Sequence, residues 1–432
     1  MFDIKEKQKQ VERALLIGVY KAPEQKEEFE SLLAELDSLV DTLGIPVIDR
    51  LLVRVQEPNP RYFVGSGKAE EIFERAKQLE IDVIIFDNGL SPAQQRNWET
   101  LTGLAVIERE EVILDIFGRR ARTKEARLQV GLARMEYSLP RLTRAWGHLS
   151  RQGGGLGGKG EGETQLETDR RLVRAQIDRF KSDLELVRLR RATQRKQRER
   201  LPLPSAAIVG YTNVGKSALL KRLTGAQVLV EDKLFATLDT TTRRVILPSG
   251  QILLLTDTVG FIRNLPHRLI EAFKATLEEA VLSDFLIHVL DASHPRVFDF
   301  YQTTMRVLEE LGADAKRMIT VLNKVDLVKD ESTLHTLRLH FPEGAFISVR
   351  SGEGLKELLH RMADLLADRV SKVELALPLD RTDLLSLLHR TSLVINVGYE
   401  DSHVSVVALV SPKVYARVEP FLVRRDPELQ PV

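Results

Sequence analysis

The sequence contains no cysteine and no long apolar run, and both absences narrow the possible classes of protein. Without cysteine there can be no disulfide and no thiolate metal site. No apolar run approaches the roughly 18 residues that a membrane-spanning helix needs, and Met1 leads into a charged stretch, so we expect no secretory signal. We therefore expect a cytoplasmic location, while a peripheral association of part of the protein with a membrane stays open.

The charge is unevenly distributed along the 432 residues, although the net charge is only +1. Residues 117–200 contain 22 Lys and Arg but 10 Asp and Glu, so this stretch carries +12 and the rest carries −11. A solvated helix face accounts for some basic excess in any protein. An excess this concentrated is more typical of a module that binds a polyanion, such as nucleic acid.

The first part of the chain alternates between two kinds of pattern. Short apolar stretches rich in β-branched residues predict strands, and the stretches between them predict helices. The strands are expected at Ala14–Tyr20, Pro46–Val55, Ile81–Phe86 and Leu104–Glu108, and the helices at Gln25–Leu43, Lys68–Leu79 and Ser91–Thr102. This alternation predicts a small α/β domain with a mostly parallel sheet.

Two narrow apolar stripes at helical spacing follow, and a glycine-rich stretch separates them. The stripes are Leu128, Leu132, Met135, Leu139 and Leu142, and then Val173, Ile177, Phe180, Leu184 and Val187. Residues 153–162 contain seven glycines in ten positions. We expect a long antiparallel helical hairpin whose tip is either functional or a flexible connector.

Composition also suggests the domain boundaries. Leu201-Pro202-Leu203-Pro204 should stop the second hairpin helix. Strands near Thr391–Val397 and Val404–Val410 and a helix from Pro412 predict a small α+β domain at the end. We expect an N-terminal α/β domain at 1–117, a basic hairpin at 118–200, an α/β domain with a doubly wound sheet at 201–370, and the α+β domain at 371–432.

The third domain begins with a phosphate-binding pattern. The strand Ser205–Val209 leads into Gly210-Tyr211-Thr212-Asn213-Val214-Gly215-Lys216-Ser217, and the helical stretch Ala218–Leu223 follows. This is a P-loop in its required strand–loop–helix context. The glycines let backbone N–H groups converge on phosphate oxygens. Lys216 should neutralise the β- and γ-phosphates, and the Ser217 hydroxyl should bind Mg²⁺.

Three later motifs select the base and complete the site. Strand Ile252–Leu255 leads to Asp257-Thr258-Val259-Gly260, where Asp257 should hold Mg²⁺ through water and the Gly260 N–H should reach the γ-phosphate. Strand Met318–Leu322 leads to Asn323-Lys324-Val325-Asp326, whose carboxylate can accept guanine's two N–H donors. The Lys324 stem can cover the base, and the backbone of Ser348-Val349-Arg350 should contact guanine O6. The order and spacing predict a P-loop GTPase domain.

We expect Lys216, Thr237 and Gly260 to act directly in hydrolysis. A threonine in Phe235-Ala236-Thr237-Leu238-Asp239-Thr240-Thr241-Thr242 should reach Mg²⁺ and the γ-phosphate. We choose Thr237 and keep Thr240–Thr242 as alternatives. Phe261 follows Gly260, where many GTPases carry a glutamine that orients water, so hydrolysis should be slow without another element. Asn213 either coordinates K⁺ beside the phosphates or only stabilises the loop.

The sequence resembles the HflX family of GTPases over nearly its whole length. The most specific string is Gly162-Glu163-Thr164-Gln165-Leu166-Glu167, directly after the glycine-rich stretch. Tyr62-Phe63-Val64-Gly65-Ser66-Gly67-Lys68, Ser91-Pro92-Ala93-Gln94-Gln95, Leu114-Asp115-Ile116-Phe117 and Phe235–Asp239 also match. One departure is Glu161, where the family usually has proline, so details of the tip are expected to differ.

The resemblance implies a GTPase that binds GTP and GDP and associates with the large ribosomal subunit and its RNA. It implies that the hairpin approaches the peptidyl-transferase region, and that the GTP-bound protein splits or rescues ribosomes under stress. It also implies that Thr237 is the Mg²⁺-linked threonine. We expect a monomer when the protein is free.

Two alternatives remain from the residues. The hairpin could pair with a helix of a non-ribosomal protein through its apolar stripe, which would make the chain a regulator of another kind. ATP binding, with which the family has been credited in its N-terminal domain, would need more than Gly65-Ser66-Gly67-Lys68, since this is only a fragment of a phosphate loop. We expect it to be a turn from strand to helix.

Overall fold

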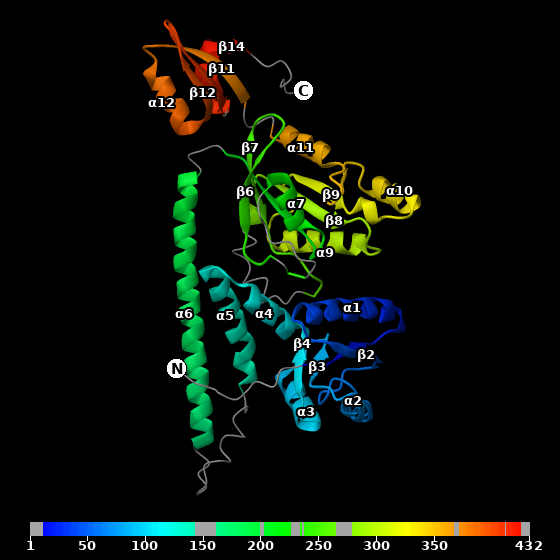
Figure 1. Ribbon diagram of the computed structural model, residues 1–432. Coiled ribbons are helices and arrows are strands. Elements are labelled where there is room, and N and C mark those ends of the chain that lie inside the picture. Colours follow the sequence, from blue (N-terminus) through cyan, green and yellow to red (C-terminus); the bar gives the residue numbers. More distant parts are fainter. Residues whose placement is uncertain are drawn as a thin grey trace. The chain divides into compact units, whose positions relative to one another are not determined.

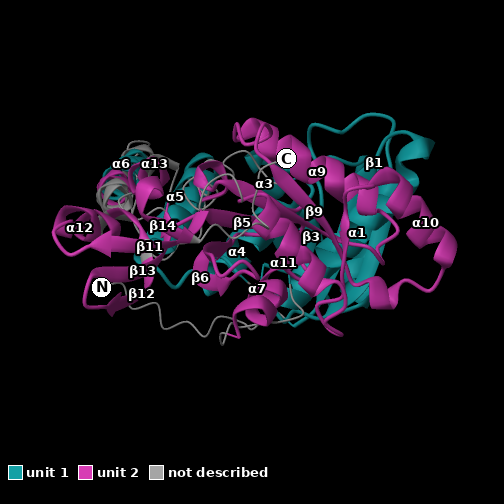
Figure 2. Cartoon of the chain, turned by 90° about the horizontal axis from the view of Figure 1, so that it is seen from above, with its two compact units in different colours: residues 1–184, 232–238, 263–273 teal, residues 185–231, 239–262, 274–432 magenta. Residues whose placement is uncertain are grey.

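The computed structural model describes residues 12–142, 161–198, 203–225, 234–235, 237–264, 279–366, 371–410 and 412–424. The glycine-rich stretch between the hairpin helices, residues 153–160, and Ala236 lie outside the described residues. The chain divides into two compact units (Figures 1 and 2). Unit 1 comprises Met1–Leu184, Asp232–Leu238 and Arg263–Phe273, and unit 2 comprises the remaining residues. No helix within the described ranges is long and apolar enough to cross a membrane.

Unit 1 begins with the expected parallel sheet. Its four strands lie in the order β2-β1-β3-β4, and every neighbouring pair is parallel. The strands are β1 (Ala14–Tyr20), β2 (Val47–Arg54), β3 (Val83–Phe86) and β4 (Ala105–Glu108). The helices between them are α1 (Lys26–Thr42), α2 (Ser66–Gln78) and α3 (Pro92–Thr102). The predicted alternation is confirmed, with boundaries within about two residues.

The sheet is packed around Trp98, which is fully buried. Its ring lies 5.3 Å from that of Phe86 and 5.7 Å from that of Tyr62, and its Nε1–H donates to the Tyr62 carbonyl at 2.8 Å. Helix α3 begins at a capping box, in which the Ser91 hydroxyl accepts from the Gln94 N–H and the Gln94 side chain accepts from the Ser91 N–H. The Ser-Pro-Ala-Gln string is therefore a helix start that fixes Trp98 in the core.

After β4 comes helix α4 (Arg109–Arg120), and the hairpin follows it. The first helix of the hairpin is α5 (Lys124–Ser138) and the second is α6 (Glu161–Arg198). The two predicted stripes meet: a Cβ on Gly131 of α5 would lie 3.2 Å from the Phe180 ring of α6. Ile177 is buried, and Lys181 pairs with Glu136 at 2.9 Å. Figure 1 shows α5 and α6 running in opposite directions beside each other. The predicted helix pairing is therefore observed between these two helices.

Unit 2 contains the doubly wound sheet. Its strand order is β10-β9-β8-β5-β7-β6, parallel except for β6, which pairs antiparallel with β7. The strands are β5 (Ser205–Gly210), β6 (Thr241–Ile246), β7 (Ile252–Asp257), β8 (Phe285–Asp291), β9 (Met318–Asn323) and β10 (Ala345–Phe346). The helices are α7 (Lys216–Thr224), α9 (Val297–Glu310), α10 (Glu331–His340) and α11 (Leu355–Asp364).

The last part of unit 2 is the expected small α+β fold, with more strands than the sequence suggested. The sheet order is β12-β13-β11-β14, and all pairs are antiparallel. Its elements are β11 (Ser371–Pro378), α12 (Thr382–Thr391), β12 (Leu393–Tyr399), β13 (His403–Val410), α13 (Pro412–Val418) and β14 (Leu422–Arg424). Buried Leu375, Leu388 and Val406 form part of one core, so this fold has its own apolar centre.

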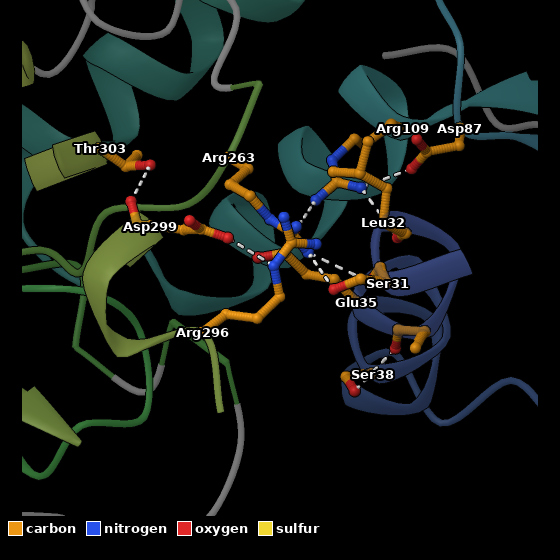
Figure 3. Close-up of polar contacts among 11 residues, drawn as sticks. Ser31, Leu32, Glu35, Ser38, Asp87, Arg109, Arg263, Arg296, Asp299 and Thr303 are labelled. Carbon is orange, nitrogen blue, oxygen red and sulfur yellow. Dashed lines mark hydrogen bonds and ion pairs between the residues drawn. The ribbon is translucent and has the colours of Figure 1, made fainter. Parts of the chain in front are cut away.

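A buried ionic network joins α1 and α4 of unit 1 to the segment that begins at Arg263 (Figure 3). Glu35 Oε2 accepts from Arg109 Nη2 at 2.7 Å and from Arg263 Nε at 3.2 Å. Arg109 also pairs with Asp87, and Arg263 donates to the Ser31 carbonyl and hydroxyl. The side chains of Glu35 and Arg109 are at most 9% exposed, so one buried carboxylate holds two arginines.

Removing this carboxylate charge should destabilise unit 1 strongly. Glu35→Gln removes the carboxylate charge that Arg109 and Arg263 share and leaves Arg109 with Asp87, and breaking a buried pair costs about 3 kcal/mol or more. Glu30→Gln is the matched control, because Glu30 lies on the same helix in an exposed pair with Lys26 and should cost less than about 1 kcal/mol. Urea unfolding measures both. Equal losses in the two variants would contradict the role given to Glu35.

Candidate functional site

The phosphate-binding segment has the geometry that the glycines predict. β5 ends at Gly210 and α7 begins at Lys216. Gly210 has φ 145° and Gly215 has φ 98°, values that side chains rarely tolerate. A Cβ on Gly210 would lie 2.3 Å from the Val289 carbonyl oxygen, and one on Gly215 would lie 2.4 Å from Asn323 Nδ2. Both glycines are therefore required by close backbone approach as well as by dihedral angle.

Lys216 is buried at the start of α7 and faces the loop that precedes it. Its Nζ donates to the Tyr211 carbonyl at 2.6 Å and to the Gly210 carbonyl at 3.2 Å. Burial lowers the pKa of Lys216 to about 8, and the nearby Asp257 opposes this shift by favouring the charged form. The ammonium is thus held inside the loop at a cost that bound phosphate oxygens would offset.

Ser217 and Asp257 lie together at the ends of adjacent elements. The Ser217 hydroxyl donates to Asp257 Oδ2 at 2.6 Å, and the Asp257 side chain is fully buried. A hydroxyl and a carboxylate are hard oxygen donors that suit Mg²⁺, which usually takes one or two carboxylates and completes its shell with phosphate oxygens and water. In the described part of the chain no cluster of three or more His, Cys, Asp or Glu could hold a metal alone. The pair therefore fits Mg²⁺ bound together with a nucleotide.

The segment after Asp257 is joined directly to the phosphate-binding loop. The Thr212 N–H donates to the Phe261 carbonyl at 2.9 Å, and the Phe261 N–H donates to the Gly210 carbonyl at 3.1 Å. A Cβ on Gly260 would lie 2.9 Å from Lys216 Nζ. The Phe261 side chain is only 2% exposed, so it packs in the interior. This agrees with the packing role considered for Phe261 and leaves the position without a group that could orient water.

The third and fourth motifs meet at the carboxyl ends of β9 and β10. The Asn323 amide donates to the Val214 carbonyl at 2.8 Å and accepts from the Val349 N–H at 3.1 Å. Lys324 has φ 64° and its Nζ pairs with Asp291 at 2.7 Å. Asp326 is exposed directly after it. The structure thus brings the phosphate-binding loop, Asn323-Lys324-Val325-Asp326 and Ser348-Val349-Arg350 to one edge of the sheet.

The threonine segment is divided between the units. Phe235, Thr237 and Leu238 belong to unit 1, in which the Phe235 ring lies edge-on to Phe117 at 4.6 Å. Thr237 is half-buried, and its role as the Mg²⁺-linked threonine stays a prediction. Thr241 and Thr242 lie in β6, where the Thr242 and Thr256 hydroxyls are hydrogen-bonded at 2.9 Å. The choice of Thr237, with Thr240–Thr242 as its alternatives, stays a prediction.

Asn213 has a local structural reason for its identity. It lies in the loop with φ 60°, a left-handed conformation that asparagine tolerates better than most residues. That geometry favours the loop-stabilising interpretation of Asn213. The K⁺ interpretation stays a prediction.

The Gly65-Ser66-Gly67-Lys68 string forms a helix start. α2 begins at Ser66, and Gly65 has φ −62°. A Cβ on Gly65 or Gly67 would meet nothing within 4 Å, so neither glycine is required by a close approach, unlike the glycines of the phosphate-binding loop. Lys68 pairs with Glu71 at 2.6 Å along the helix. This agrees with the expected turn into a helix rather than with a second phosphate loop.

Comparison with known proteins decides the family. Three family models match consecutive parts of the chain: "GTP-binding GTPase N-terminal" at residues 30–118, "GTP-binding GTPase Middle Region" at 120–198 and "50S ribosome-binding GTPase" at 205–324. The GTPase HflX of Akkermansia muciniphila is 51% identical, over 98% of this chain and 100% of its own length. That of Escherichia coli is 42% identical, over 85% and 86%.

The chain belongs to the HflX family of GTPases. It binds guanine nucleotide and is a GTP hydrolase. P-loop GTPases generally use Mg²⁺ with the bound nucleotide, which the Ser217–Asp257 pair fits. Among solved structures, a GTP-binding protein of Sulfolobus solfataricus in complex with GDP is 24% identical, over 82% of this chain and 98% of that one, with a TM-score of 0.43.

One contact of this HflX-family site was missed by sequence reasoning. Asp291, at the end of β8, pairs with Lys324, yet no motif marks it. The available signal was positional, because Asp291 is the polar residue that ends a strand whose six preceding residues are all buried. Polar side chains at that edge of a parallel sheet are candidates for the ligand site.

The pKa of Lys216 predicts a pH-dependent affinity for GDP. Bound phosphates favour the charged ammonium and raise this pKa above its value of about 8. Binding therefore takes up a proton above about pH 8, and affinity should be flat below that pH and fall by up to tenfold per unit above it. Calorimetric titration from pH 7 to about 8.8 measures this. Lys216→Ala should bind weakly with no such slope, and an equal slope in the variant would assign the proton elsewhere.

Proposed function

We propose that this GTPase acts on the large ribosomal subunit and, in its GTP-bound form, splits or rescues ribosomes under stress. The observation that carries the proposal is the charge of the hairpin region, +12 over residues 117–200. Ribosomal RNA is the dominant polyanion that such a surface would meet on a ribosome. The description of the family model over residues 205–324, a 50S ribosome-binding GTPase, supports the same partner.

The exposed side of α6 supports RNA binding. Arg171, Arg174 and Arg179 are exposed, while Ile177 is buried among the helices. An arginine guanidinium can bond bidentately to phosphate oxygens and stack on bases. The buried stripe therefore leaves the arginines available along the outer side of the helix.

The nucleotide chemistry is assigned to the residues that meet at the sheet edge. Lys216 binds the β- and γ-phosphates, and Ser217 holds Mg²⁺ directly while Asp257 holds it through water. When bound, the metal neutralises the charge that develops on the phosphates. The Gly260 N–H and Thr237 contact the γ-phosphate side, and this links the segments that follow them to the presence of GTP.

The base is recognised by the third and fourth motifs. Asp326 accepts from both N–H donors of guanine, which adenine does not offer. The Lys324 stem covers the base, and the backbone of Ser348–Arg350 contacts O6. The exposure of Asp326 and the hydrogen bonds of Asn323 to both neighbouring motifs support this assignment.

Hydrolysis is coupled to the ribosome because the chain supplies no glutamine after Gly260. Phe261 is buried and bonded through its backbone to the phosphate-binding loop, so it orients no water. Another element has to complete the arrangement around the attacking water. A contribution from the large subunit makes GTP turnover depend on docking, which suits a factor that releases after hydrolysis.

A second candidate is regulation of a protein partner through the hairpin. Leu172, Leu186 and Leu189 of α6 are 61%, 54% and 58% exposed, and such leucines could pack on a partner helix. An apolar interface of this kind would depend little on salt. The concentration of arginine on the same helix favours RNA over this alternative.

Purified large subunits should strongly stimulate GTP turnover, and the hairpin arginines should be needed for it. In potassium buffer we expect Arg171→Gln with Arg174→Gln to lose most of the stimulation while turnover without subunits stays unchanged. Neutralising two phosphate contacts should also reduce the slope of log affinity against log salt by about 1 to 2.

The matched control removes two exposed lysines elsewhere, with Lys329→Gln and Lys356→Gln. This variant should be stimulated as the original protein is. No stimulation of the original protein by large subunits would remove the ribosome from the proposal. Stimulation that is equal in both variants would remove the hairpin as the contact.

Asp326→Asn should move the base preference from guanine toward xanthine. The amide donates where the carboxylate accepted, and xanthine presents an oxygen in place of the exocyclic amine of guanine. Replacing one acceptor bond by two donors that face each other should weaken GDP binding by at least about tenfold, while XDP binding improves. Competition between labelled GDP and unlabelled XDP measures the ratio. Unchanged preference for GDP would refute the assignment of Asp326.

A further inference from the structure

The loop that follows β8 contacts the base-binding motif of the nucleotide site. It begins at Asp291, the last residue of β8, which is the register partner of Asn323 in β9. The Ala292 N–H donates to the Asn323 carbonyl at 2.8 Å, which holds the loop against the start of the base-binding motif. The loop thus starts beside Lys324.

Both carboxylate oxygens of Asp291 are engaged. Oδ2 pairs with Lys324 Nζ at 2.7 Å. Oδ1 accepts from the Ser293 N–H at 3.0 Å and from the Ser293 hydroxyl at 2.6 Å. The Asp291 side chain is 14% exposed and that of Lys324 is 26% exposed, so water screens this pair less than an ion pair at the open surface. Ser293 orients the carboxylate, and the carboxylate fixes the ammonium.

We infer that Asp291 is a positioning residue for guanine recognition, holding the Lys324 ammonium so that its aliphatic stem lies over the base. This rests on the role proposed for Lys324. A free lysine side chain loses rotamer freedom when it is fixed. A lysine already held by Asp291 loses less on binding nucleotide, so the ion pair raises affinity by preorganisation.

The other end of the loop packs on Phe300, which contacts the phosphate-binding loop. The His294 ring lies 4.5 Å from that of Phe300 in α9, and Phe300 stacks on Tyr211 with centroids 3.9 Å apart and planes 5° apart. Tyr211 follows Gly210 in the phosphate-binding loop. The loop from Asp291 to His294 therefore contacts the base end of the site directly and reaches the phosphate end through Phe300.

A purely structural role for Asp291 is the competing explanation, because Ser293 bonds to it. Asp291→Asn separates the two, since an amide oxygen still accepts from Ser293 but carries no charge for Lys324. Asp291→Glu keeps the charge on a longer arm and should recover part of any loss. Both are small changes at a partly exposed loop position.

The experiment is a double-mutant cycle on GDP and GTP affinity in the full chain. Asp291→Asn should weaken both nucleotides equally, by about tenfold, and leave kcat at saturating GTP unchanged. Lys324→Ala should weaken binding at least as much. The double variant should be no weaker than Lys324→Ala alone, because Asp291 acts through that lysine.

The matched control is Asp299→Asn, which removes the charge of another aspartate–cation pair, that with Arg296, and should bind GDP normally. If Asp291→Asn binds nucleotide normally while Lys324→Ala binds it weakly, the inference about Asp291 is wrong but the proposed base site is unaffected. Additive losses in the double variant would also overturn it. Normal binding by Lys324→Ala would instead refute the proposed base site, and with it the inference.

Discussion

The buried amide of Asn323 is the constraint on which the nucleotide site depends. It is 2% exposed, donates to the Val214 carbonyl 109 residues before it and accepts from the Val349 N–H 26 residues after it, so one side chain joins three motifs. A buried amide without partners would be costly, and here its oxygen and its nitrogen both have one. Gly215 is part of the same constraint, because a Cβ there would clash with the amide.

The parallel sheet supplies the place where this constraint can act. β5, β7, β8 and β9 all end at one edge, and each is followed at once by a functional segment. Parallel strands bring their carboxyl ends together whatever their separation in sequence. The apolar strands therefore bring distant segments together, and the short polar loops at their ends carry the residues that bind nucleotide. The Ser217–Asp257 bond and the Lys324–Asp291 pair are both products of this arrangement.

The sequence predicted the structure correctly wherever the backbone conformation requires particular residues at neighbouring positions. Gly210 and Gly215 mark left-handed or crowded positions, Ser91 with Gln94 marks a helix start, and apolar runs mark the strands of the first sheet. Apolar runs also mark β5, β7 and β9 of the second sheet, whereas β6 and β8 were not predicted. Sequence was insufficient for contacts between distant elements. Nothing near Glu35 indicates that it receives Arg109 and Arg263, because single charged residues on amphipathic helices are common and only the packing reveals which are buried. The strand β14 was missed because a three-residue edge strand carries little periodicity. The eight-residue β11 was also missed, although Val373, Leu375 and Leu377 alternate in its sequence and are buried.

Glu35, like Asn323, is a buried side chain that joins segments far apart in the sequence. Arg263 follows Phe261 by two residues, and Phe261 is bonded through its backbone to Gly210 and Thr212. Within unit 1, Arg263 is fixed by the buried carboxylate of Glu35. Phe235, two residues before Thr237, is likewise packed against Phe117 of the same unit. Phe235 and Arg263 are therefore both held within unit 1, the first by a ring contact and the second by an ion pair.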